Sequence, residues 1–407
     1  MKRRGFLNFL GNTSVALPLL SSPLGFALMN PHRENSSDLN PGSDDPILVV
    51  VELSGGNDGL NTVVPFCDDD YYRLRPNLGI RKSKLLQLDD YFGLNPGLKG
   101  LQQLWNEGDL AIVHGCGYDQ PSFSHFTSMA YWHTGTPNSG NTYGWLGRTA
   151  DAIADQRSTD LLVQISNQQS LVMNSANHTP VVFDEPTRFR RASSGLNYHE
   201  SLQNKDTGID QNDPYDYLLR VANSATESST KIQEAWASYK SEVDYGIFPI
   251  DLPKVAACIA SNYPAQIYHV AFRNNAFDTH VQQPALHQRL LSYASDAIAG
   301  FIQDLRSKKL DQKVVVLVYS EFGRRAAENA NRGTDHGTAN VMFLAGTPIK
   351  GGHYGKHPKL KDISINENID FTVDFRQVYG TVLNEWLKLD QLKVLDSQFE
   401  PFNMIVS

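Results

Sequence analysis

Runs of apolar residues alternate along the chain with segments whose apolar residues recur at helical spacing. The runs predict strands, and they lie at residues 47–53, 109–115, 159–166, 268–272, 314–319 and 340–345. Most are continuously apolar, which is typical of strands buried on both faces of a parallel sheet. The helical segments lie at 98–104, in a stretch that ends near 131, at 284–305 and at 374–387. Strands that alternate with helices predict an α/β fold whose mostly parallel sheet has helices on both faces.

Acidic and histidine side chains gather next to these predicted strands. The residues so placed are Asp58, Asp278, His280, Glu321, Asp335 and His336. Because open α/β sheets bind ligands at the carboxyl ends of their strands, we expect these side chains to share one edge. Carboxylate with imidazole suits zinc, while calcium and manganese prefer carboxylates, and such sites activate water or polarise phosphoryl-type oxygens. The pattern predicts a divalent metal site, although an Asn-Asp-Gly sequence at 57–59 is equally typical of a plain turn.

A serine-rich segment precedes the helix that ends near 131. Pro121, Ser122 and Ser124 supply good N-cap chemistry for that helix. A serine at a helix N-terminus after a strand is also the position of an activated nucleophile, because the helix dipole favours the alkoxide. The sequence leaves both roles open for Ser124.

The chain outside these elements is polar in two places. Residues 184–245 contain few apolar clusters, and helical spacing there is confined to 215–222 and 231–243. We expect a helical insertion that covers the site. Residues 30–46 are rich in Pro, Asn, Ser and Asp and predict a linker. The main domain is then a single unit at 47–407.

The first 29 residues have the pattern of an export signal. Three basic residues at 2–4 precede an uncharged, modestly apolar stretch at 15–28 that ends in a small-x-small sequence. Adjacent arginines followed by Phe-Leu resemble the twin-arginine signal. We expect the twin-arginine translocation machinery as a partner and a periplasmic or extracellular location. No segment is long and apolar enough to predict a stable membrane span.

Composition narrows the possible partners. Hydrophobic residues are 41% and charged residues 20%, which is an ordinary globular composition. The net charge of −8 argues against nucleic acid as the main partner. The three cysteines are widely spaced, so small buried hydrophobic roles are expected for them rather than a disulfide scaffold or metal site.

Five stretches together resemble a known family. They are ELSGGNDGLNTVVPF, SHFTSMAYWHTG, FDTHVQQ, YSEFGRR and TDHGTANVMFLAGTPIKGGHYG. In this order, over residues 46–390, they resemble the landmarks of the domain of unknown function 1501 family, whose members often begin with a twin-arginine signal. That family is similar to the alkaline phosphatase and sulfatase superfamily, a metal-dependent α/β fold that hydrolyses phosphate and sulfate esters.

The resemblance implies roles for individual residues. Asp278 and His280 look like the Asp-His pair of the superfamily's first metal, at a shorter spacing, and His336 resembles the later histidine of that site. Glu321 stands where the superfamily has the aspartate of a second Asp-His pair. Phe322 replaces the histidine of that pair, which puts a complete second metal site in doubt.

The same resemblance places the nucleophile and the first strand's ligand. Ser124 matches the nucleophile position, with Ser122 as the alternative and His125 as a neighbour. Asp58 has a rival in Glu52 for the ligand after the first strand. The Cys/Ser-x-Pro-x-Arg pattern of formylglycine sulfatases is absent near Ser124.

The implied function is an exported, metal-dependent hydrolase of phosphate- or sulfate-type esters, with a small-molecule or glycan substrate. The alternative is a secreted binding or scaffold protein that keeps the fold without catalysis.

Overall fold

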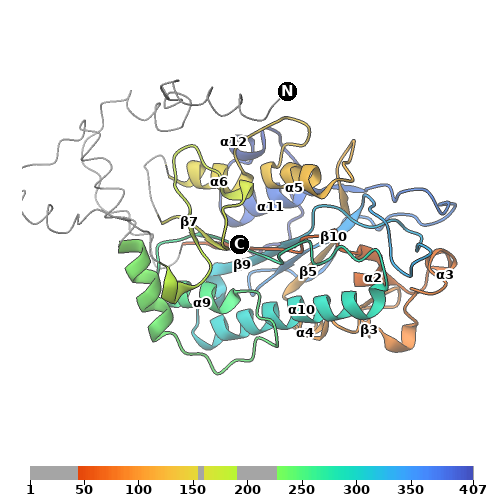
Figure 1. The fold of residues 1–407 in the computed structure, drawn as a ribbon, viewed down its shortest axis with the longest axis horizontal. Coiled ribbons are helices and arrows are strands. Elements are labelled where there is room, and N and C mark those ends of the chain that lie inside the picture. Colours follow the sequence, from red (N-terminus) through yellow and green to blue (C-terminus); the bar gives the residue numbers. More distant parts are fainter. Residues whose placement is uncertain (1–44, 155–159, 190–226, 407) are drawn as a thin grey trace, which may run out of the picture. The chain divides into compact units, whose positions relative to one another are not determined.

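The computed structural model describes residues 45–154, 160–189 and 227–406 (Figure 1). The expected signal at 1–29, nearly all of the expected linker and the expected helix at 215–222 lie outside these ranges. None of the helices in the described ranges combines the length and apolar character needed to cross a bilayer.

A nine-stranded sheet runs through the described part of the chain. Its order is β11 (Gly352–Tyr354), β5 (Leu110–Gly117), β10 (Asn340–Ala345), β9 (Val314–Tyr319), β1 (Ile47–Glu52), β8 (Ile267–Ala271), β6 (Leu162–Ile165) and β7 (Val181–Phe183), with β12 (Val373–Asp374) beside β5. Neighbours pair in parallel except at β10, which is antiparallel to β5 and to β9. The prediction of a mostly parallel sheet is confirmed.

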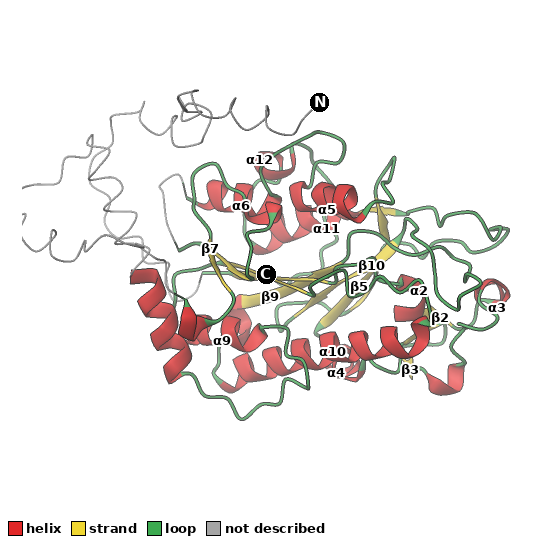
Figure 2. Cartoon of the chain, viewed as in Figure 1, coloured by secondary structure: helices red, strands yellow, loops and turns green. Residues whose placement is uncertain are grey.

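Helices cover both faces of this sheet (Figures 1 and 2). One face carries α4 (Lys99–Glu107), α9 (Leu252–Ala260) and α10 (Gln283–Ser307), and the other carries α5 (His125–Thr134), α6 (Trp145–Ile153), α11 (Phe375–Thr381) and α12 (Leu392–Leu395). Successive residues of β1 point to opposite faces, so Val49 and Val51 enter one apolar core while Leu48 and Val50 enter the other. Continuous apolar strands are the result, as the sequence pattern predicted.

Most predicted elements appear close to their expected bounds. The runs at 314–319 and 340–345 coincide with β9 and β10. Within the polar region at 184–245, residues 227–238 form a helix. Helices α6 and α9 and a small sheet of β2 (Val63–Pro65), β4 (Phe92–Leu94) and β3 (Leu86–Gln87) were not predicted. The three strands have only two or three residues each, too few to show an alternating pattern.

Helix α5 connects the two places where histidines and carboxylates meet. It begins after Ser124, whose side chain accepts a hydrogen bond from the backbone N–H of Thr127, and it ends at Gly135, which has a left-handed φ of 63°. Its first residue is His125, and His133 lies in its last turn.

Candidate metal centre

The loop after β1 holds a buried carboxylate in place. Glu321 directly follows Ser320 at the end of β9, and its two oxygens accept hydrogen bonds from the backbone N–H groups of Gly55, at 2.9 and 3.1 Å, and Gly56, at 3.1 Å. Gly55 has a φ of 119°, and a Cβ there would lie 2.5 Å from the backbone nitrogen of Asp278. Glycine is therefore required for this loop to approach both Glu321 and Asp278.

Three of the predicted ligands converge at this edge of the sheet. Oδ1 of Asp278 lies 3.1 Å from Nε2 of His280 and 3.1 Å from Nε2 of His336. The two imidazole Nε2 atoms are 2.9 Å apart. Asp278 and His280 follow β8, and His336 precedes β10, so the sequence expectation of a common edge holds for these residues.

A third histidine faces the same place. Nε2 of His125 lies 3.4 Å from Oδ2 of Asp278, and His125, Asp278 and His336 offer ligand atoms that all lie within 4.8 Å of one another. This Nε2 is a buried atom without a hydrogen-bond partner in the described structure. The sequence predicted His125 as a neighbour of the candidate nucleophile Ser124, and the structure also places it among the possible metal ligands.

The outer nitrogen of each ring meets an acceptor. Nδ1 of His125 is 2.7 Å from Oε1 of Glu321, and Nδ1 of His336 is 2.7 Å from the backbone oxygen of Phe123. Nδ1 of His280 is 3.3 Å from Oδ1 of Asp335, so this aspartate contacts the group through the His280 ring. A ring that donates through Nδ1 keeps a lone pair on Nε2, and this is the arrangement of metal-ligating histidines.

Charge in the group is set by burial and by Arg324. Burial raises the pKa of the Asp278 carboxyl, but the hydrogen bonds of Arg324 and His336 and the guanidinium charge lower it to about 2. Nη2 of the fully buried Arg324 lies 2.7 Å from Oδ1 of Asp278. The hydrogen bond to Glu321 raises the pKa of His125, while burial lowers the pKa of His336. The group thus contains an ionised carboxylate among imidazoles.

Asp58 and Glu321 lie differently from the expected ligands. The Asp58 carboxylate is buried, pairs with Nη1 of Arg75 at 2.7 Å and accepts from Nε2 of Gln283 at 2.5 Å. Burial raises its pKa, but the charge of Arg75 holds the pKa below its usual value. Asp58 therefore does not join the others. Glu321 joins only through His125, since backbone donors already occupy both of its oxygens.

Phe322, which follows Glu321 in the chain, packs against two of the histidine rings. Its ring centroid lies 4.9 Å from that of His125 and 4.6 Å from that of His336. The histidine partner of Glu321 comes instead from α5, 196 residues earlier in the chain. Only the fold could show this pairing.

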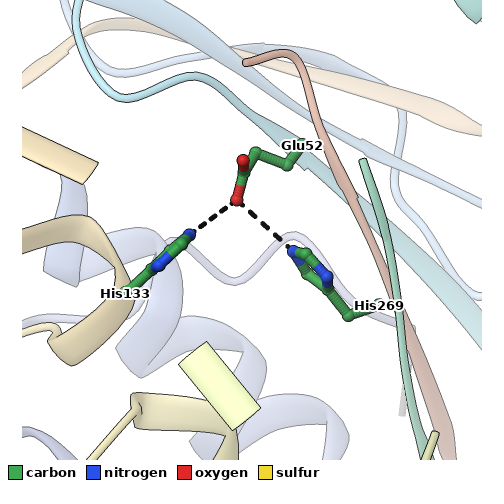
Figure 3. Close-up of side chains that lie close together, drawn as sticks. All are labelled: Glu52, His133 and His269. Carbon is green, nitrogen blue, oxygen red and sulfur yellow. Dashed lines mark hydrogen bonds and ion pairs between the residues drawn. The ribbon is translucent and has the colours of Figure 1, made fainter. Parts of the chain in front are cut away.

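Two further histidines form a second group around Glu52 (Figure 3). One oxygen of Glu52, Oε2, lies 2.7 Å from Nε2 of His133 and 3.4 Å from Nε2 of His269. All three side chains are buried, and their ligand atoms lie within 4.8 Å of one another. Burial raises the pKa of the Glu52 carboxyl, but the charges and hydrogen bonds of His133 and His269 hold it well below its usual value.

Glu52 was a candidate ligand from the sequence, but neither of its two partners was predicted. His269 interrupts an apolar strand, and an ionisable residue inside a buried strand requires a partner. That signal was available. His133, by contrast, sits at the end of a helix where a histidine has many ordinary uses.

Comparisons with known proteins place the chain as follows. A family model described as "Protein of unknown function (DUF1501)" matches residues 46–398. No curated protein matches the chain.

The solved structures to which the chain is similar include three of about one-tenth identity. Ps i-CgsB in complex with k-i-k-neocarrahexaose has 11% identity and a TM-score of 0.37, with 89% of this chain and 75% of that chain covered. Lipoteichoic acid synthase LtaP from Listeria monocytogenes has 12% identity and a TM-score of 0.35, with 84% and 78% covered. BT1596, a 2-O GAG sulfatase, has 12% identity and a TM-score of 0.36, with 88% and 76% covered. TM-scores below 0.5 do not support an assignment of chemistry, so the chemistry of this chain has to be inferred from its own side chains.

Proposed function

The chain belongs to the family described as "Protein of unknown function (DUF1501)", and from that premise we propose that it is an exported, metal-dependent hydrolase of phosphate- or sulfate-type esters. The export part rests on the N-terminal pattern at residues 1–29, which predicts the twin-arginine route to the periplasm or the exterior. The substrate is a small-molecule or glycan ester.

One observation carries the metal part of the proposal. Oδ1 of Asp278 and the Nε2 atoms of His280 and His336 are 2.9 to 3.1 Å apart. Ligands about 2.0–2.2 Å from a tetrahedral zinc ion lie roughly 3.3 Å from one another, so a small cation fits after a shift of a few tenths of an ångström. Imidazole donors favour zinc over calcium, and manganese is the next choice.

A divalent cation held by these residues would act as a Lewis acid and stabilise the charge that develops on the transferred group. Arg324 fixes the Asp278 carboxylate and is held in turn by four backbone oxygens, which belong to Gly55, Gly56, Phe277 and Thr334. Glu321 fixes the His125 ring. The ligands are therefore held in place before a substrate arrives.

The start of α5 supplies the candidate nucleophile. Ser124, which the sequence favoured, is exposed, and Oγ accepts from the Thr127 backbone N–H at 3.5 Å as the N-cap. Oγ of Ser122 accepts from the Ser124 backbone N–H at 3.3 Å and so supports the same turn. His125 is the next residue and points at Asp278.

Metal analysis with matched variants tests the proposal. Purified full-length protein is expected to contain at least one equivalent of a divalent metal and to hydrolyse an aryl phosphate or an aryl sulfate. Asp278→Ala and His336→Ala should lose both properties, whereas Asp70→Ala, at a surface aspartate paired with Arg73, should keep them.

A metal-free wild-type protein that is inert toward both esters would overturn the proposal. The alternative of a secreted binding protein would then gain support. Export is tested separately by replacing Arg3 and Arg4 with lysine, which should leave the protein in the cytoplasm.

A further inference from the structure

Residues 384–401 form a polar cavity whose described lining includes none of the candidate metal ligands. Its volume is about 350 Å³, at the lower end of the range of about 300–1,000 Å³ that is usual for small-molecule sites. The helical turn η5 (Val382–Trp386), the residues just before α12 and the segment that follows α12 all contribute to it. The lining residues that matter here are Asn384, Asp390, Gln391, Gln398, Phe399 and Glu400.

Hydrogen bonds hold the walls of this cavity in place. The buried side chain of Gln391 donates to the backbone oxygen of Phe399 at 2.9 Å and accepts from its backbone N–H at 3.0 Å. Oδ1 of Asn384 accepts from the Gln391 backbone N–H at 3.3 Å. A Cβ at Gly380 would lie 2.2 Å from Oε1 of Gln391, so a side chain there would push the amide away from these bonds. The cavity is therefore formed before a ligand binds, which lowers the cost of binding.

Four side chains at the lining have hydrogen-bonding groups to spare. Oδ1 of Asn384 is used, as is Oδ1 of Asp390, which accepts from the Leu392 backbone N–H at 3.0 Å. Nδ2 of the former and Oδ2 of the latter make no hydrogen bond among the described residues. The side chains of Gln398 and Glu400 are exposed and likewise make none within the described ranges. Two amides and two carboxylates are thus available to a ligand.

This mixture of donors and acceptors selects the kind of ligand. The amides of Asn384 and Gln398 can donate, whereas the carboxylates of Asp390 and Glu400 only accept. The described lining contains no Lys, Arg or His, so its two negative charges disfavour an anion. A cationic amine would satisfy the carboxylates but would leave the amide donors unused. A hydroxyl group both donates and accepts, and neighbouring hydroxyls on one molecule use both kinds of partner.

Phe399 adds an apolar surface to the same cavity. Its half-buried ring packs against one apolar core, and the guanidinium carbon of Arg376 lies 4.9 Å from the ring centroid. These contacts hold the ring at the lining, where its carbon atoms can contact the C–H groups of a ligand. The ligand that fits is therefore small and uncharged, and it carries several hydroxyls together with C–H groups.

We infer that this cavity is a binding site for an uncharged saccharide. The inference does not depend on the proposed function, because it uses none of the candidate metal ligands. It assigns a recognition role to the α12 end of the chain, for which neither the sequence nor the metal centre provides one.

Titration calorimetry and saturation-transfer NMR on the full-length protein test the inference. The probes are glucose, galactose and mannose, each compared with its 2-amino derivative as the cationic probe and with its 6-sulfate as the anionic probe. At least one of the uncharged sugars should bind saturably to a single site. It should bind at least 10-fold more tightly than its amino and sulfated derivatives.

Two conservative variants locate the binding. Asn384→Asp keeps the oxygen that accepts from the Gln391 backbone but replaces the spare donor with an acceptor. Asp390→Asn keeps the oxygen that accepts from the Leu392 backbone but removes the charge. Each should weaken binding of the selected sugar by at least 10-fold, with thermal unfolding like that of wild type.

Asp396→Asn is the matched control. It makes the same Asp-to-Asn change at the residue after α12, whose carboxylate pairs with Arg148 at 2.9 Å and does not line the cavity. This variant should bind the sugar as wild type does. Wild-type affinity in both cavity variants, tighter binding of an amino or sulfated sugar, or no saturable binding of any of the three uncharged sugars would each overturn the inference. None of these outcomes bears on ester hydrolysis.

Discussion

Two groups of histidines and carboxylates share helix α5 but are built in opposite ways. At the start of the helix, His125 joins His280 and His336 around Asp278, and the group is partly open to solvent. At its end, His133 joins His269 around Glu52, and that group is closed. Each group consists of histidines around one acidic side chain.

The outer ring nitrogens distinguish the two groups. In the open group each Nδ1 faces an acceptor, namely Glu321, the Phe123 carbonyl or Asp335. In the closed group Nδ1 of His269 lies 3.3 Å from the amide nitrogen of Gln164. The oxygen of that amide accepts from the Ser170 backbone N–H at 2.9 Å, so the amide presents its N–H to the ring.

His133 follows the same rule. Its Nδ1 lies 3.3 Å from Oγ of Ser170, and that oxygen accepts from the backbone N–H of Val172, which leaves the hydroxyl proton free for the ring. Both rings of the closed group therefore keep a proton on Nε2. His133 lies 2.7 Å from Oε2 of Glu52, and Tyr319 donates to the same oxygen at 3.1 Å. Nε2 of His269 faces that oxygen at 3.4 Å without a regular hydrogen bond.

The difference shows that the hydrogen-bond partners of the outer ring nitrogens, rather than the residue types, separate the two roles. Acceptors around the open group leave the Nε2 lone pairs available to bind a cation. Donors around the closed group leave N–H groups that neutralise a buried anion. The open group is suited to chemistry, and the closed group is suited to holding β1, β8 and α5 together.

The largest effect should come from removing the carboxylate of the open group. Asp278→Ala is expected to lower ester hydrolysis by about 10³-fold, or about 4 kcal/mol, because the cation loses a ligand and Arg324 loses its anion. The free energy of unfolding should fall by about 1 kcal/mol at most, since Arg324 keeps its four backbone acceptors. Steady-state kinetics and urea titration measure the two effects. A loss of unfolding free energy larger than the loss of transition-state stabilisation would contradict the distinction between the two groups.

The closed group should show the reverse pattern. Glu52→Ala is expected to lower the free energy of unfolding by about 3–4 kcal/mol, because two buried imidazoles lose their acceptor and a cavity remains. Metal content should stay at the wild-type level. Glu52→Gln, which keeps the volume and one acceptor oxygen, should cost about half as much. Loss of a metal equivalent in either variant would show that the closed group also holds a cation.

A third histidine group tests the influence of burial without a buried carboxylate. His114, His353 and His357 lie near Phe92, and the carboxylate partner of His353 is the more exposed Asp89. Burial, followed by the charge of His353, lowers the pKa of His357 to about 4, and burial lowers the pKa of His114 and of His353 as well.

A histidine with a lowered pKa takes up its proton more readily in the unfolded chain. Its stabilising effect is complete above the unfolded pKa of about 6.5 and is lost as the pH falls toward the folded pKa. Urea titrations at pH 7 and pH 4.5 should show wild type losing about 2 kcal/mol more than His357→Gln. Parallel losses in the two proteins would contradict the expected burial of this ring.

The smallest effect should come from changing one outer partner in the closed group. Gln164→Glu would offer Nδ1 of His269 an acceptor and still accept from Ser170, so Nε2 could release its proton to a metal. We expect zinc affinity of the closed group to rise by at least 10-fold, or about 1.4 kcal/mol, in an Asp278→Ala background that lacks the open site. Equilibrium dialysis measures this. Unchanged binding would show that the outer hydrogen bonds do not decide between the two roles.

The sequence by itself determined the sheet and the edge at which the candidate metal ligands lie. Continuous apolar runs can be buried only on both faces, so 314–319 and 340–345 appear as β9 and β10. Asp278 and His280 follow the parallel strand β8, while His336 precedes β10, whose antiparallel direction puts its amino end at the same edge, and the three side chains meet there. These features follow from local periodicity and from chain direction, both of which are written in the sequence.

Only the tertiary structure decided which polar groups are partners. Asp58 pairs with Arg75 and lies apart from the candidate metal ligands, and Glu321 pairs with His125, 196 residues earlier in the chain. The tautomers of all five histidines in the two groups depend on the outer partners, such as Gln164, which no spacing rule connects to them. Burial makes each donor find an acceptor, but three-dimensional packing alone determines which acceptor is within reach.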